Sequence, residues 1–155
     1  MARQSRAPTL LLTRPAPQSQ RFAQQLRARL GDVAVVISPL MQTEFHQPAL
    51  PARHFQAVIF TSETGVEAAM RLQANLPTRA FCVGNRTAEA ARARGFAALS
   101  ADGEVKALAA MILASGIKGP ILHLRGADSA GDLAGALTNA GLETVSLIVY
   151  SQNPT

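Results

Sequence analysis

The sequence predicts an α/β protein with a doubly wound parallel sheet, and three observations support this prediction. Short apolar runs alternate with helix-like runs over almost the whole chain. The short runs are nearly continuously apolar, as in parallel strands that are covered on both faces. The residues that follow them are rich in hydroxyls, glycine and arginine. A chain of 155 residues with 48% hydrophobic residues can bury such a core and is not expected to be disordered.

The first predicted elements form a small unit. Residues 9–13 form an apolar run bounded by prolines, residues 19–30 have the period of an amphipathic helix, and residues 33–37 are rich in valine and isoleucine. This strand–helix–strand unit, residues 9–37, is too small to be a domain. We therefore expect it to be a piece of something larger. Residues 39–53 contain three prolines and no period, so we predict a connector there.

Residues 54–150 contain the larger predicted domain. Its expected strands are residues 57–60, 80–83, 97–99, 121–124 and 144–149, and its expected helices are residues 65–73, 87–94, 104–114 and 131–140. Right-handed crossovers between these strands give a doubly wound domain. The five strands match the flavodoxin-like pattern in number, and their order stays open. Residues 151–155 are predicted to be a return linker.

Three of the predicted helices carry capping signals at their start. Thr64 and Glu67 have the spacing of a capping box, and so do Ser129 and Asp132. Asp102 precedes the helix expected at residue 104 and is its predicted cap.

Charge and composition narrow the possible partners. The formal net charge is +5, and arginine supplies most of the positive charge because Lys106 and Lys118 are the only lysines. Arginine favours bidentate contact with carboxylates or phosphates. Aromatic residues make up only 5% of the chain, with no tryptophan, which argues against a stacking platform for nucleic acid. We therefore expect a small acidic ligand.

Cysteine use and hydropathy predict the compartment. Cys82 is the only cysteine, so no disulfide can form within the chain, and a reducing environment is expected. No apolar run approaches the 18 residues of a membrane span. The sequence thus predicts a soluble cytoplasmic protein that does not contact membranes.

The candidate binding residues come from the predicted strand ends. In doubly wound sheets the ligand binds outside the carboxyl ends of the strands, near helix N-termini that favour negative charge. The candidates are Arg14, Thr61, Ser62, Gly84, Asn85, Thr87, Arg125, Gly126 and Tyr150. Helix capping and ligand binding favour the same residue types at these turns, so both interpretations stay open.

Other kinds of site lack their motifs. The chain has no G-x-G-x-x-G, no P-loop and no G-x-S-x-G elbow, which argues against dinucleotide, nucleotide and serine hydrolase sites. His46, His54 and His123 lack the spacing of metal ligands, so we interpret them as surface or core histidines.

Six segments carry a family resemblance: LLTRP, SPLMQTEF, VIFTSETGVEAA, FCVGNRTAEAARARGF, ILHLRGADSAGDLAGALTNAG and VSLIVY. Their order and spacing resemble the uroporphyrinogen-III synthases. The resemblance implies two flavodoxin-like domains, in a chain that begins in one domain, completes the second and returns to the first. Residues 1–38 would then be the incomplete N-terminal part of domain 1, and residues 54–150 would be domain 2. Members of the family are longer, so we expect this chain to be a fragment.

The resemblance also implies the chemistry. Family members convert hydroxymethylbilane to uroporphyrinogen III, with loss of water and inversion of ring D, and they need no metal or cofactor. The substrate's eight carboxylates suit an arginine-rich protein and open helix N-termini. A monomer is implied, with transient contact to the enzyme that supplies hydroxymethylbilane.

The resemblance assigns roles to particular residues. Tyr150 matches the family's tyrosine and is the candidate to assist loss of the hydroxyl, with an interdomain hinge anchor as the alternative. Ser62 and Thr87 match substrate-contacting positions, and Gly84 and Gly126 would let backbone amides approach carboxylates. Where many bacterial relatives have an arginine after the RG pair, this chain has Gly131. A non-catalytic anion- or tetrapyrrole-binding α/β module is the alternative function.

Overall fold

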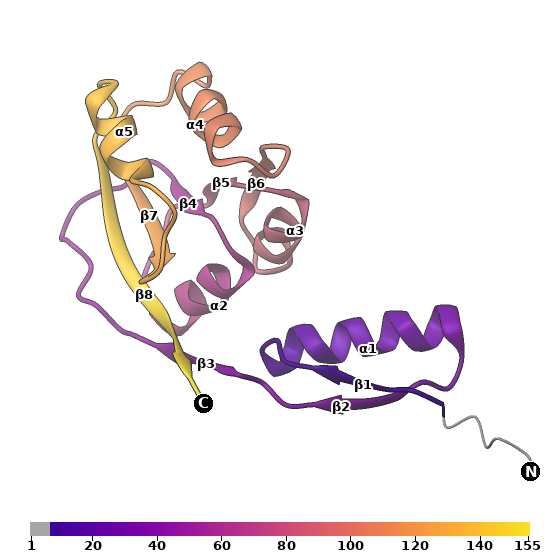
Figure 1. Cartoon of the computed structure of the whole chain (residues 1–155). Coiled ribbons are helices and arrows are strands. Elements are labelled where there is room, and N and C mark those ends of the chain that lie inside the picture. The colour runs from indigo at the N-terminus through magenta and orange to yellow at the C-terminus, as the bar shows by residue number, and fades with distance from the viewer. Residues whose placement is uncertain (1–6) are drawn as a thin grey trace, which may run out of the picture. The chain divides into compact units, whose positions relative to one another are not determined.

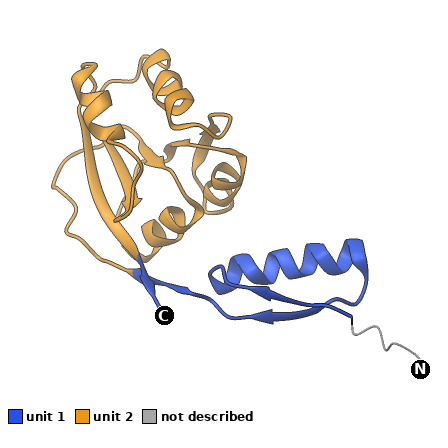
Figure 2. Cartoon of the chain, viewed as in Figure 1, with its two compact units in different colours: residues 1–44, 152–155 blue, residues 45–151 orange. Residues whose placement is uncertain are grey.

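The structure, a computed structural model, describes residues 7–155 (Figure 1). The chain divides into two compact units, one of residues 1–44 with residues 152–155, and one of residues 45–151 (Figure 2). The chain thus leaves the first unit after residue 44 and re-enters it after residue 151.

The first unit contains two parallel strands joined by a helix. These elements are β1 (Thr9–Leu12), α1 (Ala16–Leu30) and β2 (Ala34–Ile37). At the start of α1 the Ser19 hydroxyl donates to the Arg14 carbonyl at 2.9 Å. The following Gly31 has φ 76°, a left-handed conformation that suits glycine at a helix end. Two strands and one helix cover few side chains, and the large apolar residues left exposed include Leu11, Leu30 and Val36.

The second unit is a sheet covered by helices. Between residues 45 and 155 the strands are β4 (Val58–Phe60), β5 (Arg79–Cys82), β6 (Ala97–Ser100), β7 (Ile121–Gly126) and β8 (Thr144–Pro154), and the helices are α2 (Glu63–Arg71), α3 (Asn85–Ala93), α4 (Val105–Ala114) and α5 (Leu133–Asn139). The five strands are parallel, in the order β6-β5-β4-β7-β8. A further strand, β3 (Met41–Phe45), lies beside β8.

The helices cover both faces of this sheet. α2 and α3 pack together on one face, and α4 and α5 pack together on the other (Figure 1). Strand residues alternate between the two layers. Val58 and Phe60 pack in the core beneath α2 and α3, whereas Ile59 packs with Leu108 and Leu137 of α4 and α5. The predicted doubly wound parallel α/β class is confirmed.

The strand order shows where a ligand is expected. From β4 the chain proceeds through β5 to β6 on one side, and it then crosses to β7 and β8 on the other side. This third-second-first-fourth-fifth order is that of the first five strands of a Rossmann sheet, and it differs from the order in flavodoxin. The direction of winding reverses between β4 and β7. Ligands of doubly wound proteins bind at such a switch point, outside the carboxyl ends of the two strands.

The segments predicted as linkers contain strand structure. β3 lies within the connector expected at residues 39–53, and β8 continues to Pro154 through the expected return linker. The two strands pair antiparallel, from His46 with Val149 to Leu40 with Thr155. Each of these segments gives the other backbone partners, so the strands form without an apolar pattern in either segment.

The predicted caps are corrected in all three cases. α2 begins earlier than expected, and its cap is Ser62, not Thr64. The cap of α5 is Asp132 itself, and Ser129 lies outside the helix. Asp102 has φ 25° in the turn before α4 and does not cap that helix. Each helix therefore starts one or two residues away from its expected position.

Deleting residues 1–38 is expected to leave a protein that unfolds cooperatively. The remaining residues 39–155 keep the five-stranded sheet and both helical layers, which hold most of the buried apolar residues. Differential scanning calorimetry of the deletion protein, beside the complete chain, checks this. A heat capacity trace without a transition would show that the division into units is wrong.

Candidate functional site

Ser62 and Tyr150 meet at the carboxyl edge of the sheet. Ser62 caps α2, and its Oγ accepts a hydrogen bond from the Gly65 amide at 2.9 Å. The same Oγ lies 2.9 Å from the Tyr150 hydroxyl oxygen on β8. A serine hydroxyl has one donor and two acceptor positions, so Ser62 can donate to Tyr150 while it accepts from Gly65. In that arrangement the Tyr150 proton is free to be donated to a ligand.

Gly126 provides the space for the Tyr150 ring. A register shift between β7 and β8 places Gly126 opposite Tyr150. A Cβ on Gly126 would lie 2.6 Å from Cζ and 2.9 Å from the hydroxyl oxygen of Tyr150. The structure therefore gives this glycine a steric role, in addition to the amide contact expected from the sequence.

Gly126→Ala is expected to push the Tyr150 ring away from Ser62 and to destabilise the fold by about 1 to 3 kcal/mol, because the site has no room for a methyl group. Gly84→Ala is the control. Gly84 has an extended backbone, and an added Cβ would meet its nearest neighbour at 3.5 Å. Urea unfolding of both variants checks the difference. Equal stability of the two variants would contradict the steric role of Gly126.

A second polar group lies on the opposite face of the same strands. His123 is 2% exposed, and its Nε2 lies 3.0 Å from Thr61 Oγ1. Burial, aided by the positive charge of Arg125, lowers the pKa of His123 to about 4. The imidazole is therefore neutral at pH 7, as expected for a core histidine.

The Arg125 side chain has acceptors within the protein. Its Nε donates to Ser146 Oγ at 2.7 Å, and a terminal nitrogen donates to the Gly126 carbonyl at 2.9 Å. These hydrogen bonds hold the end of β7 next to β8. A carboxylate that bound to Arg125 would compete with these two acceptors.

The N-terminus of α3 is open. Gly84, the N-cap residue, has no side chain to cap the helix, and the first turn contains no acidic residue. The first backbone amides of a helix have no partner within it, and its dipole favours an anion there. Asn85 is exposed at this end, whereas Thr87 is 6% exposed and its hydroxyl bonds to no residue within 7–155. By contrast, Ser62 and Asp132 cap α2 and α5 with their side chains.

The structure groups only some of the predicted residues by direct contact. Tyr150 lies next to both Ser62 and Gly126, whereas Arg14 lies exposed in the first unit. Sequence reasoning missed that His123 is the partner of Thr61. The pattern ILHLRG did contain a signal, because a polar residue at every second position of a buried strand lies on one face.

Residues 7–155 contain neither a metal-binding cluster nor a membrane-spanning helix. Within residues 7–155, no three His, Cys, Asp or Glu side chains are grouped so that they could hold a metal ion. In the same range, no helix has the length and apolar character needed to cross a membrane.

Comparison with known proteins identifies the family. The family model described as uroporphyrinogen-III synthase HemD matches residues 20–155. The chain belongs to the uroporphyrinogen-III synthase family. No curated protein sequence is significantly similar to it.

Solved structures of uroporphyrinogen-III synthases share its fold. A mutant enzyme from the extremely thermophilic bacterium Thermus thermophilus is 18% identical with a TM-score of 0.59, over 96% of this chain and 64% of that one. The enzyme from Helicobacter pylori is 20% identical with a TM-score of 0.61, over 83% of this chain and 60% of that one. This chain thus spans less than two thirds of the length of either uroporphyrinogen-III synthase.

Proposed function

We propose that this chain carries the site at which a uroporphyrinogen-III synthase removes the hydroxyl group of hydroxymethylbilane. The complete reaction is that of a cyclising hydro-lyase, which closes the linear tetrapyrrole to uroporphyrinogen III with inversion of ring D. The observation that carries the proposal is the Ser62–Tyr150 hydrogen bond at the switch point of the sheet. It supports Tyr150 as the group that reaches the departing hydroxyl.

In the proposed mechanism Tyr150 donates a hydrogen bond to the leaving hydroxyl. Ser62 fixes the direction of the phenol group, since its own oxygen is held by the Gly65 amide. The hydroxyl takes up one proton, from Tyr150 or through it from solvent, and leaves as water. The carboxylate-binding groups hold the remaining cation-like tetrapyrrole in the pose that closes the ring through a spiro intermediate, and a proton is released as the ring closes. This division gives Tyr150 a role in the rate and leaves binding to other residues.

The open N-terminus of α3 is the proposed carboxylate subsite. Its free amides and helix dipole favour an anion, and the Thr87 hydroxyl can donate a further hydrogen bond. Gly84 and Asn85 border the same turn. An acetate or propionate arm of the tetrapyrrole fits this subsite, whereas the side-chain caps of α2 and α5 already occupy the corresponding positions there.

A coupled assay with separation of the product isomers tests the function. Hydroxymethylbilane closes without an enzyme, so a synthase must both accelerate closure and direct it to isomer III. The assay should be run on residues 1–155 and on any longer form of the protein. Closure at the uncatalysed rate and isomer ratio in every form would contradict the proposal.

Thr87→Val is expected to raise KM by about 5- to 30-fold, which corresponds to the loss of about 1 to 2 kcal/mol for one hydrogen bond to a charged group. Thr87→Ser keeps the hydroxyl and should retain the KM. Thr78→Ala removes a hydroxyl at the amino end of β5 and serves as a distant control. If KM is the same in Thr87→Val and Thr78→Ala, Thr87 does not contact substrate.

We further propose that the enzyme acts as a cytoplasmic monomer. Its single cysteine is buried, as suits a reducing compartment. Because hydroxymethylbilane closes spontaneously, transient contact with the enzyme that supplies it would limit loss to the uncatalysed product.

A further inference from the structure

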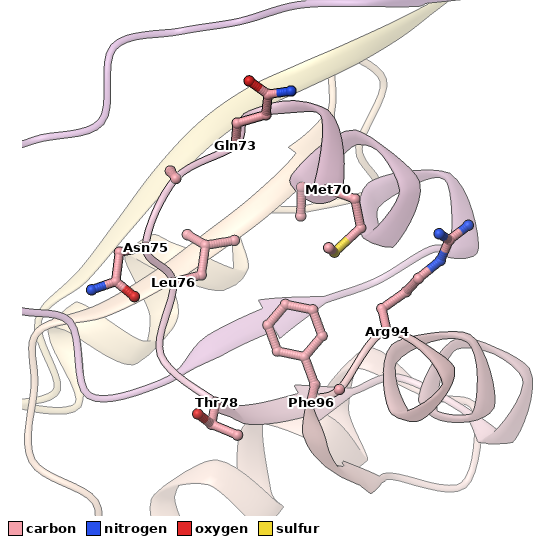
Figure 3. Close-up of a pocket in the computed structure, with 10 residues that line it drawn as sticks. Met70, Gln73, Asn75, Leu76, Thr78, Arg94 and Phe96 are labelled. Carbon is pink, nitrogen blue, oxygen red and sulfur yellow. The ribbon is translucent and has the colours of Figure 1, made fainter.

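A pocket lies at the opposite edge of the sheet from the candidate site. It has a volume of about 240 Å³ and is formed by the end of α2, the segment before β5, and the turn between α3 and β6 (Figure 3). Because these are the amino ends of β5 and β6, the pocket is separate from the Ser62–Tyr150 site at the carboxyl edge.

The wall of the pocket combines apolar and polar side chains and includes an aromatic ring. Met70, Leu76 and Phe96 line it, and Met70 is 41% exposed although its side chain is apolar. Phe96 is held in place by Phe60 of the core, in an edge-to-face pair with the ring centroids 5.2 Å apart. A fixed ring and a thioether group provide favourable contacts for a second aromatic ring.

One charged side chain lines the pocket. Arg94 is exposed there, and its guanidinium has no hydrogen bond or ion pair with any residue between 7 and 155. No acidic side chain is among the residues that line the pocket. In Figure 3 the Arg94 side chain starts beside Phe96, and its guanidinium points away from the ring. A free guanidinium at the edge of the pocket suits a carboxylate on the arm of a ligand.

The C-terminal ends of α2 and α3 lie at this pocket, and hydrogen bonds reduce the negative partial charge of some of their carbonyl groups. Two carbonyl groups at the end of α3 have partners, because the Phe96 amide donates to Ala91 at 3.1 Å and the Gly95 amide donates to Arg92 at 3.0 Å. At the end of α2 the Gln73 amide donates to the Met70 carbonyl at 3.4 Å. Arg94 therefore sets the sign of the charge at the pocket.

Gln73 lines the pocket in a strained conformation. Its φ is 49°, in the left-handed region that non-glycine residues rarely adopt. Gln73 follows Leu72, the C-cap of α2, and a left-handed residue at this position commonly ends a helix.

We propose that this pocket binds a small monocarboxylate with one aromatic ring, with the ring between Met70, Leu76 and Phe96 and the carboxylate on Arg94. The volume sets the size of the ligand, because a cavity of roughly 150 Å³ accommodates benzene. A single ring with a short acidic arm fits the pocket, and a complete tetrapyrrole does not. The site is additional to the one for the tetrapyrrole and does not depend on the proposed function.

The test uses 3-phenylpropionate as the probe and the amide NMR shifts of residues 1–155 as the readout. We expect the amides of Gln73, Thr78 and Gly95 to shift together, with a Kd of about 0.1 to 1 mM, as is usual for a ligand of this size. Arg94→Gln should raise this Kd by about 1.5- to 5-fold, the range for one exposed ion pair. Lys118→Gln removes the same charge outside the pocket and should leave the Kd unchanged.

Two further comparisons separate the contributions of the ring and the charge. The neutral alcohol 3-phenylpropan-1-ol should bind to the wild-type protein about as weakly as the acid binds to Arg94→Gln, and propionate should not shift these amides. Ala74→Phe places a ring in the pocket and should abolish binding. The proposal is overturned if the pocket amides do not respond to the acid, if the alcohol binds as tightly, or if a folded Ala74→Phe protein still binds it.

Discussion

Replacing Tyr150 with Phe is expected to slow turnover by about 10- to 1000-fold, the range that one positioned proton donor or hydrogen bond contributes. The variant keeps the ring against Gly126 and removes only the hydroxyl that meets Ser62. Substrate KM should change little, because the carboxylate arms bind at other groups. A loss in kcat without a change in KM identifies an interaction made in the transition state.

A different result is expected if Tyr150 acts only as a hinge anchor between the two units. Tyr150 lies directly before Ser151, where the second unit ends. If its ring acts only as a hinge anchor, Tyr150→Phe should keep both the turnover and the isomer ratio of the wild-type enzyme. Such a result would remove Tyr150 from the chemistry and leave catalysis to positioning alone. Turnover and isomer ratio are both measured by separating the products over time.

Much of the fold could be predicted because the apolar pattern of each strand is local. The runs VIF and ILHL form buried strands where they were expected, since a strand between two helical layers must be apolar on both faces. The class of the protein follows from the alternation of such runs with helices. The same local pattern predicted which residues lie at the carboxyl ends of the strands.

The strand order and the ends of the elements could not be predicted, because they depend on partners far away in the sequence. The continuation of β8 past Tyr150 depends on pairing with β3, about a hundred residues earlier. The helix caps depend on the backbone conformation of each turn. At α2 both Ser62 and Thr64 are suitable cap residues, and only the backbone shows that Ser62 has the extended conformation.

The hydrogen-bond partners at the candidate site could not be predicted from the sequence either. Ser62 and Tyr150 are 88 residues apart, and Thr61 and His123 are 62 residues apart. Each residue could be named as a strand-end or core candidate. Ser62 and Tyr150 bond on one face of the sheet, and Thr61 and His123 bond on the other. This arrangement follows from the sheet register, which could not be predicted from the sequence.

Acid is expected to lower the free energy of unfolding, because His123 must be protonated. The folded state lowers the pKa of His123 from 6.5 to about 4, first by burial and second by the charge of Arg125. An unfolded histidine takes up a proton near its ordinary pKa, whereas the folded one resists protonation. The full contribution to stability is therefore present above about pH 6.5, and it is lost as the pH falls to about 4. The loss over this window is about 3 kcal/mol.

His123→Gln isolates this contribution, because glutamine does not titrate and its side chain can still bond to Thr61. Urea unfolding of both proteins at a series of pH values from 7 to about 4 gives the difference in the free energy of unfolding. His46, His54 and every carboxylate are present in both proteins, so their contributions cancel in the comparison. The wild-type protein should lose about 3 kcal/mol more than the variant on acidification. Parallel pH profiles of the two proteins would mean that His123 is protonated as easily in the folded state as in the unfolded state. The buried, neutral imidazole beside Thr61 would then be the wrong description of this core.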